Sequence, residues 1–289
     1  MRRRLEWARD GQDWPNRDAS RFVAAGGITW HVQVAGSGKV LLLVHGTGAA
    51  THSWRGLLPL LAPHFTVIAP DLPGHGFTET PPPARLSLPG MAFGLAQLLH
   101  ALGLPPPALA AGHSAGAAIL VRMCLDRRIG PATIVSLNGA LLPLPGVSEH
   151  VFSPIARLLA ALPPVPWLFA RRAGARPVTE RLLAGTGSTL DEEGVRLYQR
   201  LAGTPGHVAA ALGMMAQWDL RPLAQQLPAL AQRLLLVTGS NDRTVPPSEA
   251  GRVRRSLPTA ELLSLPGLGH LAHEERPDLV AALLVKRAA

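Results

Sequence analysis

The strongest constraint on the fold is a regular alternation of short apolar runs with longer helix-like segments. Helical patterns are centred on residues 53–62, 87–102, 115–128, 247–256 and 274–286. The apolar runs between and beside them are "KVLLLVHG", "FTVIAPD", "ALAAGHS", "ATIVSLNG", "RLLLVTGSND" and "AELLSLPG". Strands that are apolar on both faces are typical of a mostly parallel sheet with helices on either side. The run "ITWHVQVAG", from Ile28, alternates polar and apolar residues, and we expect the early strands at an antiparallel edge.

The alternation fails between Leu141 and Pro228, where short helical patterns are separated by prolines and glycines. The patterns are "HVFSPIARLLAAL", "VPWLFARR", "PVTERLLAG", "DEEGVRLYQRLAG" and "GHVAAALGMMAQW". A crossover helix with long loops is the alternative interpretation, but ordinary connections in α/β units run about 2–6 residues. We therefore predict a helical cap at 141–228, inserted into a core made of residues 1–140 and 229–289.

Bulk properties narrow the class further. A chain of 289 residues with 47% hydrophobic content suits one large α/β core with an insertion. The single cysteine, Cys124, excludes an intramolecular disulfide and fits a reducing, cytoplasmic compartment. The N-terminal residues lack the apolar core of a secretory signal, and the uncharged runs 104–121 and 129–148 are broken by glycine and proline. We expect no transmembrane helix.

The formal charge of +9 comes almost entirely from arginine, with lysine only at Lys39 and Lys286. The arginines are scattered, aromatic residues make up 4% of the chain, and no basic block with interleaved aromatics occurs. This pattern argues against nucleic-acid binding. Attraction to an anionic membrane surface or to an acidic protein partner stays open.

The residues Gly112-His113-Ser114-Ala115-Gly116 follow a predicted buried strand and open a helix. That is the context of a G-x-S-x-G nucleophile elbow, in which glycines permit a tight turn and the helix N-terminus favours developing negative charge. A small-residue turn with no chemistry is the alternative. The context favours Ser114 as a nucleophile.

A serine hydroxyl needs a base, and on this architecture the partners follow in the order serine, acid, histidine. His270 ends "LPGLGH", directly after a predicted strand, and Asp242 follows another in "LLLVTGSND". We predict the triad Ser114, Asp242 and His270. The weaker candidates are His150, His207 and His273 for the base, and Asp219 and Glu249 for the acid; an Asx turn is the structural alternative for Asp242.

The negative charge that develops on a carbonyl oxygen during acyl transfer needs hydrogen-bond donors. The Ala115 backbone N–H comes with the elbow, and we assign the second donor to the backbone N–H of Thr47 in "HGTG". A plain glycine turn is the alternative there. The sequence has no H-E-x-x-H, C-x-x-C or G-x-x-x-x-G-K-[ST] pattern, so we expect no metal, no cofactor and no ATP-driven motor.

Taken together, "HGTG", "DLPGHGFTE", "GHSAG", "GSNDRTVP" and "LPGLGHLAHEERP" resemble the α/β-hydrolase superfamily over roughly residues 20–286. Serine at position 114 is similar to esterases, lipases and C–C bond hydrolases, and unlike the haloalkane dehalogenases and epoxide hydrolases, which have aspartate there.

A closer resemblance, spanning nearly the whole chain, is to the magnesium-chelatase accessory proteins of photosynthetic bacteria. It rests on "VHGTGAATHSWR", "DLPGHGFTETPP", "GHSAGAAILVRMCLD", "SLNGALLPLPG" and "PGHVAAALGMMAQWDLRPL". The resemblance implies a role near magnesium insertion into protoporphyrin IX, with magnesium-chelatase subunits as candidate partners and the inner or photosynthetic membrane as a candidate location.

Three functions stay open at this stage. The first is a serine hydrolase for a large apolar substrate, whose pocket we expect to include Trp54, His113, Trp167, Met215 and Trp218; packing of the cap's own core is the alternative role for its apolar residues. The second is an accessory protein that binds a tetrapyrrole or a chelatase subunit on a hydrolase scaffold. The third is a general carboxylesterase or lipase at a membrane surface, suggested by "LLAALPPVPWLFARR".

Overall fold

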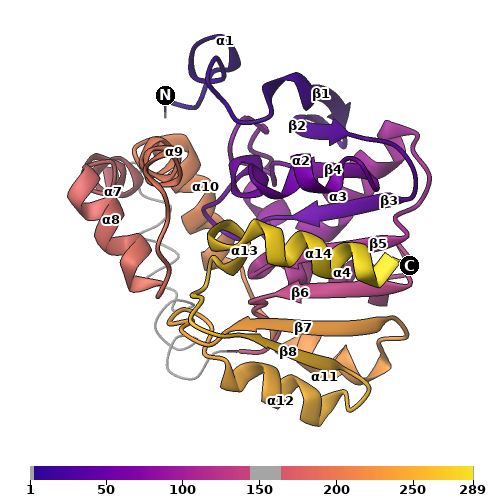
Figure 1. Cartoon of the computed structure of the whole chain (residues 1–289). Helices are drawn as coiled ribbons and strands as arrows, with labels where there is room; N and C mark the ends of the chain where they lie inside the picture. Colours follow the sequence, from indigo (N-terminus) through magenta and orange to yellow (C-terminus); the bar gives the residue numbers. More distant parts are fainter. Residues whose placement is uncertain (1–2, 144–163, 289) are drawn as a thin grey trace.

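A computed structural model describes residues 3–143 and 164–288, and its centre is one eight-stranded sheet (Figure 1). The strand order is β1-β2-β4-β3-β5-β6-β7-β8. The pairs β1–β2 and β2–β4 are antiparallel, and all the others are parallel. The strands are β1 (Ser20–Ala25), β2 (Ile28–Ala35), β3 (Val40–Val44), β4 (Thr66–Pro70), β5 (Leu109–His113), β6 (Thr133–Leu137), β7 (Arg233–Gly239) and β8 (Glu261–Leu265).

The expected mostly parallel sheet with an antiparallel edge is confirmed. The strands β3, β5 and β6 are buried along their whole length, which explains their continuous apolar sequences. The outermost strand β1 was not expected from the sequence. It is an edge strand with mostly exposed or half-buried residues, so it carries no apolar run that would signal it.

Helices cover both faces of the sheet (Figure 1). One face is packed by α3 (Leu88–Leu102), α4 (Ala115–Leu125), α11 (Arg221–Gln226) and α12 (Ser248–Ser256). The other is packed by η2 (Thr51–Trp54), α2 (Leu57–Leu61) and α14 (Pro277–Ala288). The segment 274–286, expected as one helix, is divided into α13 (Ala272–Glu275) and α14, because Pro277 starts a new helix and cannot continue the previous one.

The segment between β6 and β7 is helical, as expected, and projects beyond the sheet (Figure 1). It contains α7 (Pro164–Ala173), α8 (Arg176–Gly185), α9 (Glu192–Ala202) and α10 (Pro205–Ala216) before α11 and η4 (Leu227–Ala229). The expected helix "HVFSPIARLLAAL" lies outside the described residues. The helix α11 falls inside the range 141–228, yet its Leu223 belongs to the main core cluster, as does Leu227 at the start of η4.

Three short elements complete the chain: α1 (Trp7–Asp10), η1 (Arg17–Ala19) and η3 (Pro83–Leu86). The N-terminal segment reaches the cap, where Arg200 pairs with Asp13 at 2.7 Å. Within the ranges 3–143 and 164–288, no helix combines the length and the apolar character needed to cross a membrane.

Candidate functional site

Ser114 lies at the sharp turn between β5 and α4. Its backbone has φ 51° and ψ −116°, a left-handed conformation that L-residues rarely adopt. The neighbouring glycines make this turn possible: a Cβ on Gly116 would lie 2.0 Å from the Val44 carbonyl oxygen, and one on Gly112 would lie 2.5 Å from the Ala117 nitrogen. The serine is thus held at a helix N-terminus by a backbone that admits nothing larger around it.

Asp242 and His270 are joined by a buried hydrogen bond. His270 Nδ1 donates to Asp242 Oδ2 at 2.8 Å, and the two residues are 5% and 6% exposed. The other oxygen, Oδ1, accepts the backbone N–H groups of Thr244 and Val245 at 2.8 and 2.9 Å. This Asx turn fixes the carboxylate, so the structural role and the interaction with His270 coexist. The bond also leaves His270 Nε2 as the ring's free nitrogen.

Asn138, at the end of β6, is a further partner of the acid. Its Nδ2 donates to Asp242 Oδ2 at 2.8 Å and to the Gly269 carbonyl oxygen at 3.2 Å. The residue is 1% exposed and has φ 50°. Asn138 therefore ties the loop that carries Asp242 to the loop that carries His270. The sequence analysis missed it, although the only available signal, an asparagine directly after a buried strand, is present in "SLNG".

The two predicted oxyanion donors have free backbone N–H groups. Among the described residues, neither the N–H of Thr47 nor that of Ala115 has an acceptor. The Thr47 hydroxyl contacts Met214 Sδ at 3.5 Å. No hydrogen bond joins Ser114 to His270 within the described part of the chain. Such contacts often tighten only when substrate binds.

The weaker base and acid candidates lie elsewhere. His273 is buried against Ser53, with 2.8 Å between its Nε2 and the serine Oγ. His207, on α10, donates from Nε2 to the Gly48 carbonyl oxygen at 3.0 Å and accepts the Gly76 N–H at Nδ1. Asp219 binds Arg221 and Glu249 binds Arg252. His150 lies outside the described residues.

The predicted pocket residues are placed in different environments. Met215 lines a cavity over Thr47, whereas Trp54 and Trp218 are buried in the hydrophobic clusters on the two faces of the sheet. Trp167 is 52% exposed on α7. His113 is buried under the site: its Nε2 donates to the His270 carbonyl oxygen at 3.0 Å, and burial is the main reason that its pKa lies well below the ordinary value. It supports the histidine loop from below.

The cavity beside Met215 has a volume of about 210 Å³. Its wall is mostly apolar and combines the loop that contains Thr47 with α7, α8, α9 and α10; it includes Thr47, Gly48, Phe169, Leu183, His207 and Met215. Pockets that enclose a drug-sized ligand measure about 300–1,000 Å³. As bounded by the described residues, this cavity is smaller than that range and mostly apolar.

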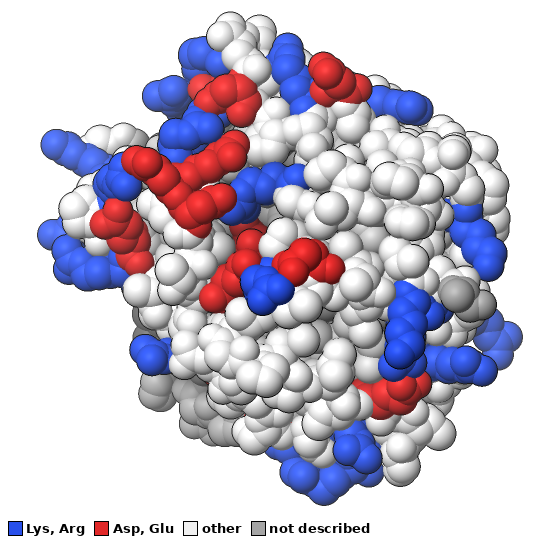
Figure 2. Space-filling model, in the orientation of Figure 1, with Lys and Arg blue, Asp and Glu red and all other residues white. Residues whose placement is uncertain are grey.

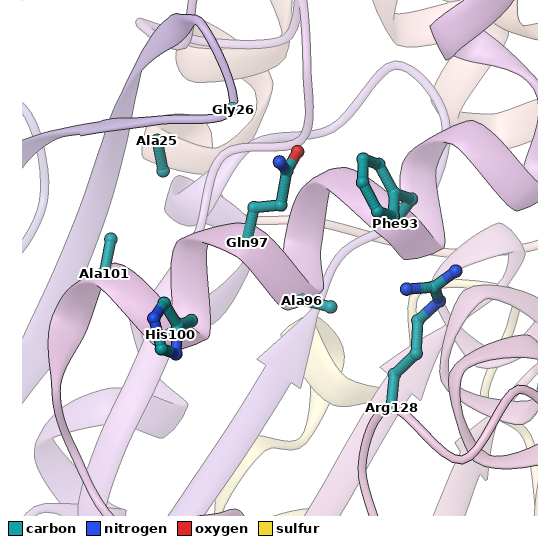
Figure 3. A pocket seen from close by; sticks show the side chains of 8 residues that line it. All are labelled: Ala25, Gly26, Phe93, Ala96, Gln97, His100, Ala101 and Arg128. Atoms are coloured by element: carbon teal, nitrogen blue, oxygen red, sulfur yellow. The ribbon is translucent and has the colours of Figure 1, made fainter.

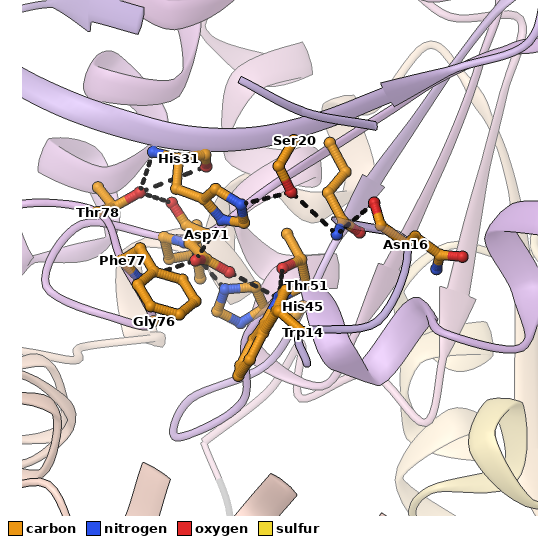
Figure 4. Close-up of polar contacts among 12 residues, drawn as sticks. Trp14, Asn16, Ser20, His31, His45, Thr51, Asp71, Gly76, Phe77 and Thr78 are labelled. Carbon is orange, nitrogen blue, oxygen red and sulfur yellow. Dashed lines mark hydrogen bonds and ion pairs between the residues drawn. The ribbon is translucent and has the colours of Figure 1, made fainter. Parts of the chain in front are cut away.

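A buried polar network centred on Asp71 fixes the end of the segment Thr47–Thr51 (Figure 4). Asp71 pairs with His31 Nδ1 at 2.7 Å and accepts the backbone N–H groups of Thr51 and Phe77 at 2.6 and 2.9 Å. Burial by itself would raise the pKa of Asp71, but His31 and these donors hold it far below its usual range. In the same region His45 Nε2 accepts the Leu72 N–H, and burial lowers the pKa of His45 to about 4.

A second concavity lies away from the candidate site, between the β1–β2 turn and α3 (Figure 3). Its volume is about 390 Å³ and its lining includes Gly26, Phe93, Gln97, His100 and Arg128. The Arg128 guanidinium lies over the Phe93 ring at 4.9 Å, and Gln97 accepts from Arg85. None of its lining residues is shared with the cavity over Thr47. This groove is therefore a surface separate from the cavity over Thr47.

Among residues 3–143 and 164–288, no group of three or more histidine, cysteine, aspartate or glutamate side chains could hold a metal ion. Cys124 is a buried free thiol, and burial raises its pKa to about 12. It is therefore a poor nucleophile.

The fold and the elbow define a class that comparison with known proteins identifies. The family model of the alpha/beta hydrolase fold matches residues 39–277, and the chain belongs to this family. A "Magnesium-chelatase 30 kDa subunit" from Rhodobacter capsulatus is 40% identical over 275 residues, covering 94% of this chain and 95% of that relative. The resemblance to the chelatase-associated family noted from the sequence is thus confirmed.

More distant relatives include enzymes. A "2-hydroxy-6-oxo-2,4-heptadienoate hydrolase" from Pseudomonas putida is 27% identical over 270 residues, covering 90% of this chain and 93% of that protein. The solved structure of the epoxide hydrolase CorEH superposes with a TM-score of 0.77 at 23% identity, covering 92% of this chain and 97% of that one. At this level of identity the superposition shows the fold alone.

Proposed function

We propose that this chain is a serine hydrolase that cleaves an ester or a related carbonyl compound with a large apolar part. Ser114 Oγ attacks the carbonyl carbon and its proton passes to His270 Nε2, while Asp242 holds the imidazole tautomer. The backbone N–H groups of Thr47 and Ala115 stabilise the oxyanion. The leaving alcohol takes the proton from His270. Water, activated by the same imidazole, then hydrolyses the acyl-serine and releases the acid.

The observation that carries this proposal is the buried 2.8 Å hydrogen bond from His270 to a carboxylate fixed by three other donors. The Asx turn uses Oδ1 and would not by itself require a histidine on Oδ2. Among the described residues, the N–H groups of Thr47 and Ala115 have no acceptor, and Thr47 lines the cavity. Unpaired amides of this kind suit a developing negative charge, which supports the same interpretation. The mechanism requires no cofactor and no metal.

The size of the cavity refines the substrate class. Its 210 Å³ accommodate an apolar acyl group or ring substituent, with the rest of a larger molecule remaining at its mouth. Because a relative named as a magnesium-chelatase subunit shares 40% identity with this chain, we place the reaction in bacteriochlorophyll biosynthesis, near magnesium insertion into protoporphyrin IX, with chelatase subunits as partners. The substrate is then a tetrapyrrole ester or a lipid ester handled beside it.

Hydrolysis of p-nitrophenyl esters by the purified protein and by Ser114→Ala tests the chemistry. The variant should lose kcat by about 10³-fold or more, while Ser240→Ala, a change at an exposed serine outside the proposed triad, should keep it. Metabolite profiles of a Ser114→Ala strain and a deletion strain test the biological role. The same tetrapyrrole should accumulate in both; accumulation in the deletion strain alone would reject a catalytic role in the pathway.

That last outcome would favour the second candidate function, a tetrapyrrole-binding accessory protein on a hydrolase scaffold. It is favoured by the name of the 40% identical relative and by the apolar cavity. Titration with protoporphyrin IX and its magnesium complex would distinguish the two: a saturable shift of the Soret band, unchanged in Ser114→Ala and weakened in Ala211→Phe, supports binding without catalysis. No shift at micromolar protein rejects it.

We also propose that the protein acts in the cytoplasm at the surface of the inner or photosynthetic membrane, through its cap. The α7 residues Trp167, Leu168 and Phe169 are 52%, 55% and 46% exposed, and Leu182 on α8 is 50% exposed. Basic side chains lie over α7 and α8, at the left of the view in Figure 2, with acidic side chains among them. Aromatic and aliphatic side chains flanked by arginines are suited to an anionic bilayer surface. Phe169 and Leu182 also line the cavity, so the cavity borders this face.

Flotation with vesicles tests this surface. The protein should float with vesicles that contain phosphatidylglycerol and much less with pure phosphatidylcholine. Trp167→Glu combined with Leu168→Glu should abolish flotation, because each glutamate is repelled by the negatively charged vesicle and replaces an apolar side chain that would contact it. Phe93→Glu is the matched control, since Phe93 is 42% exposed in the remote groove of Figure 3. Equal loss in the control, or no flotation of the wild type, would overturn the proposal.

A further inference from the structure

Residues 186–189 lie in the connector between α8 and α9. They belong to the cap but contact both loops that carry the proposed acid and base. The carbonyl oxygen of Thr186 accepts two backbone N–H groups, from Arg243 and from His270, each at 3.2 Å. Arg243 directly follows Asp242. One cap carbonyl thus fixes the backbone on the acid side and on the histidine side at the same time.

The next two residues of the connector add side-chain bonds. Asn241 Nδ2 donates to the Gly187 carbonyl oxygen at 2.6 Å, and the Ser188 hydroxyl accepts the Leu271 N–H at 2.8 Å. Ser188 is 5% exposed and Leu271 is 4% exposed, so water cannot readily replace this bond. The connector therefore contacts the residue before Asp242, the residue after it, His270 itself and the residue after His270.

Close backbone packing explains why this junction contains glycines. Gly187 has φ +82°, and a Cβ there would lie 1.9 Å from the Asn241 carbonyl oxygen. A Cβ on Gly269, next to His270, would lie 2.3 Å from the carbonyl carbon of Gly187. The two loops and the cap connector approach one another at backbone distance. Beside them, Glu275 bridges the two segments by accepting the N–H groups of Gly269 and Thr189 at 2.8 and 3.1 Å.

From these contacts we infer that the connector Thr186–Ser188 positions the Asp242–His270 pair, with Ser188 as a positioning residue. The connector between α8 and α9 is then the part of the cap that is bound to both loops. This inference rests on the proposed function only for its kinetic readout. The hydrogen bond between His270 and Asp242 can be observed whether or not the protein is a catalyst.

Ser188→Ala tests the inference, because it removes the acceptor of a buried N–H without adding bulk. For p-nitrophenyl esters, kcat should fall about tenfold while KM changes less than twofold, since the binding cavity is untouched. The low-field ¹H NMR resonance of His270 Nδ1–H should move upfield or broaden, because the imidazole is held less firmly. Ser188→Thr, which keeps the hydroxyl, should restore both properties.

Ser240→Ala is the matched control. The Ser240 hydroxyl accepts the Gly267 N–H at 2.8 Å. Gly267 lies in the loop that carries His270, three residues before it. The control variant should leave kcat and the resonance unchanged. If Ser188→Ala does not fold, Asn241→Ala, at an exposed position, removes the bond to Gly187 and should lower kcat several-fold.

Equal effects of Ser188→Ala and Ser240→Ala, or an unchanged kcat and an unchanged resonance in Ser188→Ala, would overturn the inference. A wild-type protein without esterase activity would instead count against the proposed function. The resonance would then still decide whether the connector positions the pair.

Discussion

At the scale of single residues, the site depends on positions where backbone geometry and chemistry constrain each other. Ser114 and Asn138 both have positive φ, at 51° and 50°, and each directly follows a buried strand. Ser114 stands at the proposed reacting centre, and Asn138 binds the carboxylate that orients the histidine. Strain of this kind persists only where surrounding packing enforces it, and it concentrates at functional sites. The strain at Ser114 leads to a test that is independent of catalysis.

Replacing Ser114 by glycine should give a more stable protein than replacing it by alanine, by about 1 kcal/mol. Alanine keeps the Cβ that makes φ 51°, ψ −116° unfavourable, whereas glycine adopts positive φ readily. Chemical denaturation measures the free energy of unfolding of both variants. At Arg254, an exposed position inside α12, the order should be reversed, with glycine less stable than alanine by about 0.5–1 kcal/mol. The same order at both positions would show that the elbow stores no strain.

At the scale of elements, the sequence predicted what depends on local pattern. The continuous apolar strands, the strand-to-helix context of Ser114 and the loops after β7 and β8 all follow from periodicity and turn residues, so the fold and three candidate residues could be chosen beforehand. The contacts of Asn138, His207 and Ser188 could not. Each of them joins segments far apart in the chain, and a polar residue carries no local signal of which distant partner it meets.

The pocket residues illustrate the same limit. Apolar residues of a cap serve both its own packing and a ligand, and the sequence does not separate the two roles. On α10, the residues that line the cavity recur with the helical repeat: His207, Val208, Ala211, Leu212 and Met215. Trp218, three residues beyond Met215, is 8% exposed and belongs to the main core. Only the placement of the helix decides which apolar side chains line the cavity.

Filling the cavity should therefore change substrate preference more than catalysis. Ala211→Phe adds a ring at the wall of a 210 Å³ space. We expect kcat/KM for a p-nitrophenyl ester with a long acyl chain to fall about tenfold, with p-nitrophenyl acetate changing less than twofold. The matched control is Ala96→Phe in the groove of Figure 3, which should change neither substrate. Equal losses for both esters would place the acyl group elsewhere.

At the scale of the whole molecule, the candidate site is where two differently built parts meet. The sheet and its helices hold Ser114, Asp242 and His270 at the ends of β5, β7 and β8, while the cap supplies much of the cavity and the connector that braces two of these loops. Around this junction several histidines are buried without charge. The free energy of unfolding of the protein therefore depends on pH.

The pKa values of these histidines give the direction of that dependence. Burial, the largest cause in each case, lowers the pKa of His45 to about 4 and that of His75, His207 and His273 to about 3, from an ordinary 6.5. Below pH 6.5 the unfolded chain binds protons at these imidazoles and the folded chain does not. Stability is therefore fully present above about pH 6.5 and is lost as the pH falls, by up to about 1.4 kcal/mol per histidine per pH unit.

Two buried acids change this expectation little. The pKa of Asp71 is held below its ordinary 3.8, so its contribution is lost only below that pH. Burial raises the pKa of Glu274, which acts in the opposite direction, but it is one group against six histidines whose pKa burial lowers, since His52 and His113 are also shifted down. We expect the free energy of unfolding to fall by roughly 5 kcal/mol between pH 7 and pH 5.5, which is comparable with the whole stability of many domains.

Urea denaturation at a series of pH values measures this slope. The matched variant is His75→Phe, since His75 Nε2 is buried without a partner among the described residues. Whatever its absolute stability, the variant should lose about one proton from the pH dependence between pH 7 and pH 5.5, because one titrating group has been removed. A free energy of unfolding that stays constant over this range would show that these histidines take up protons in the folded protein as readily as in the unfolded chain.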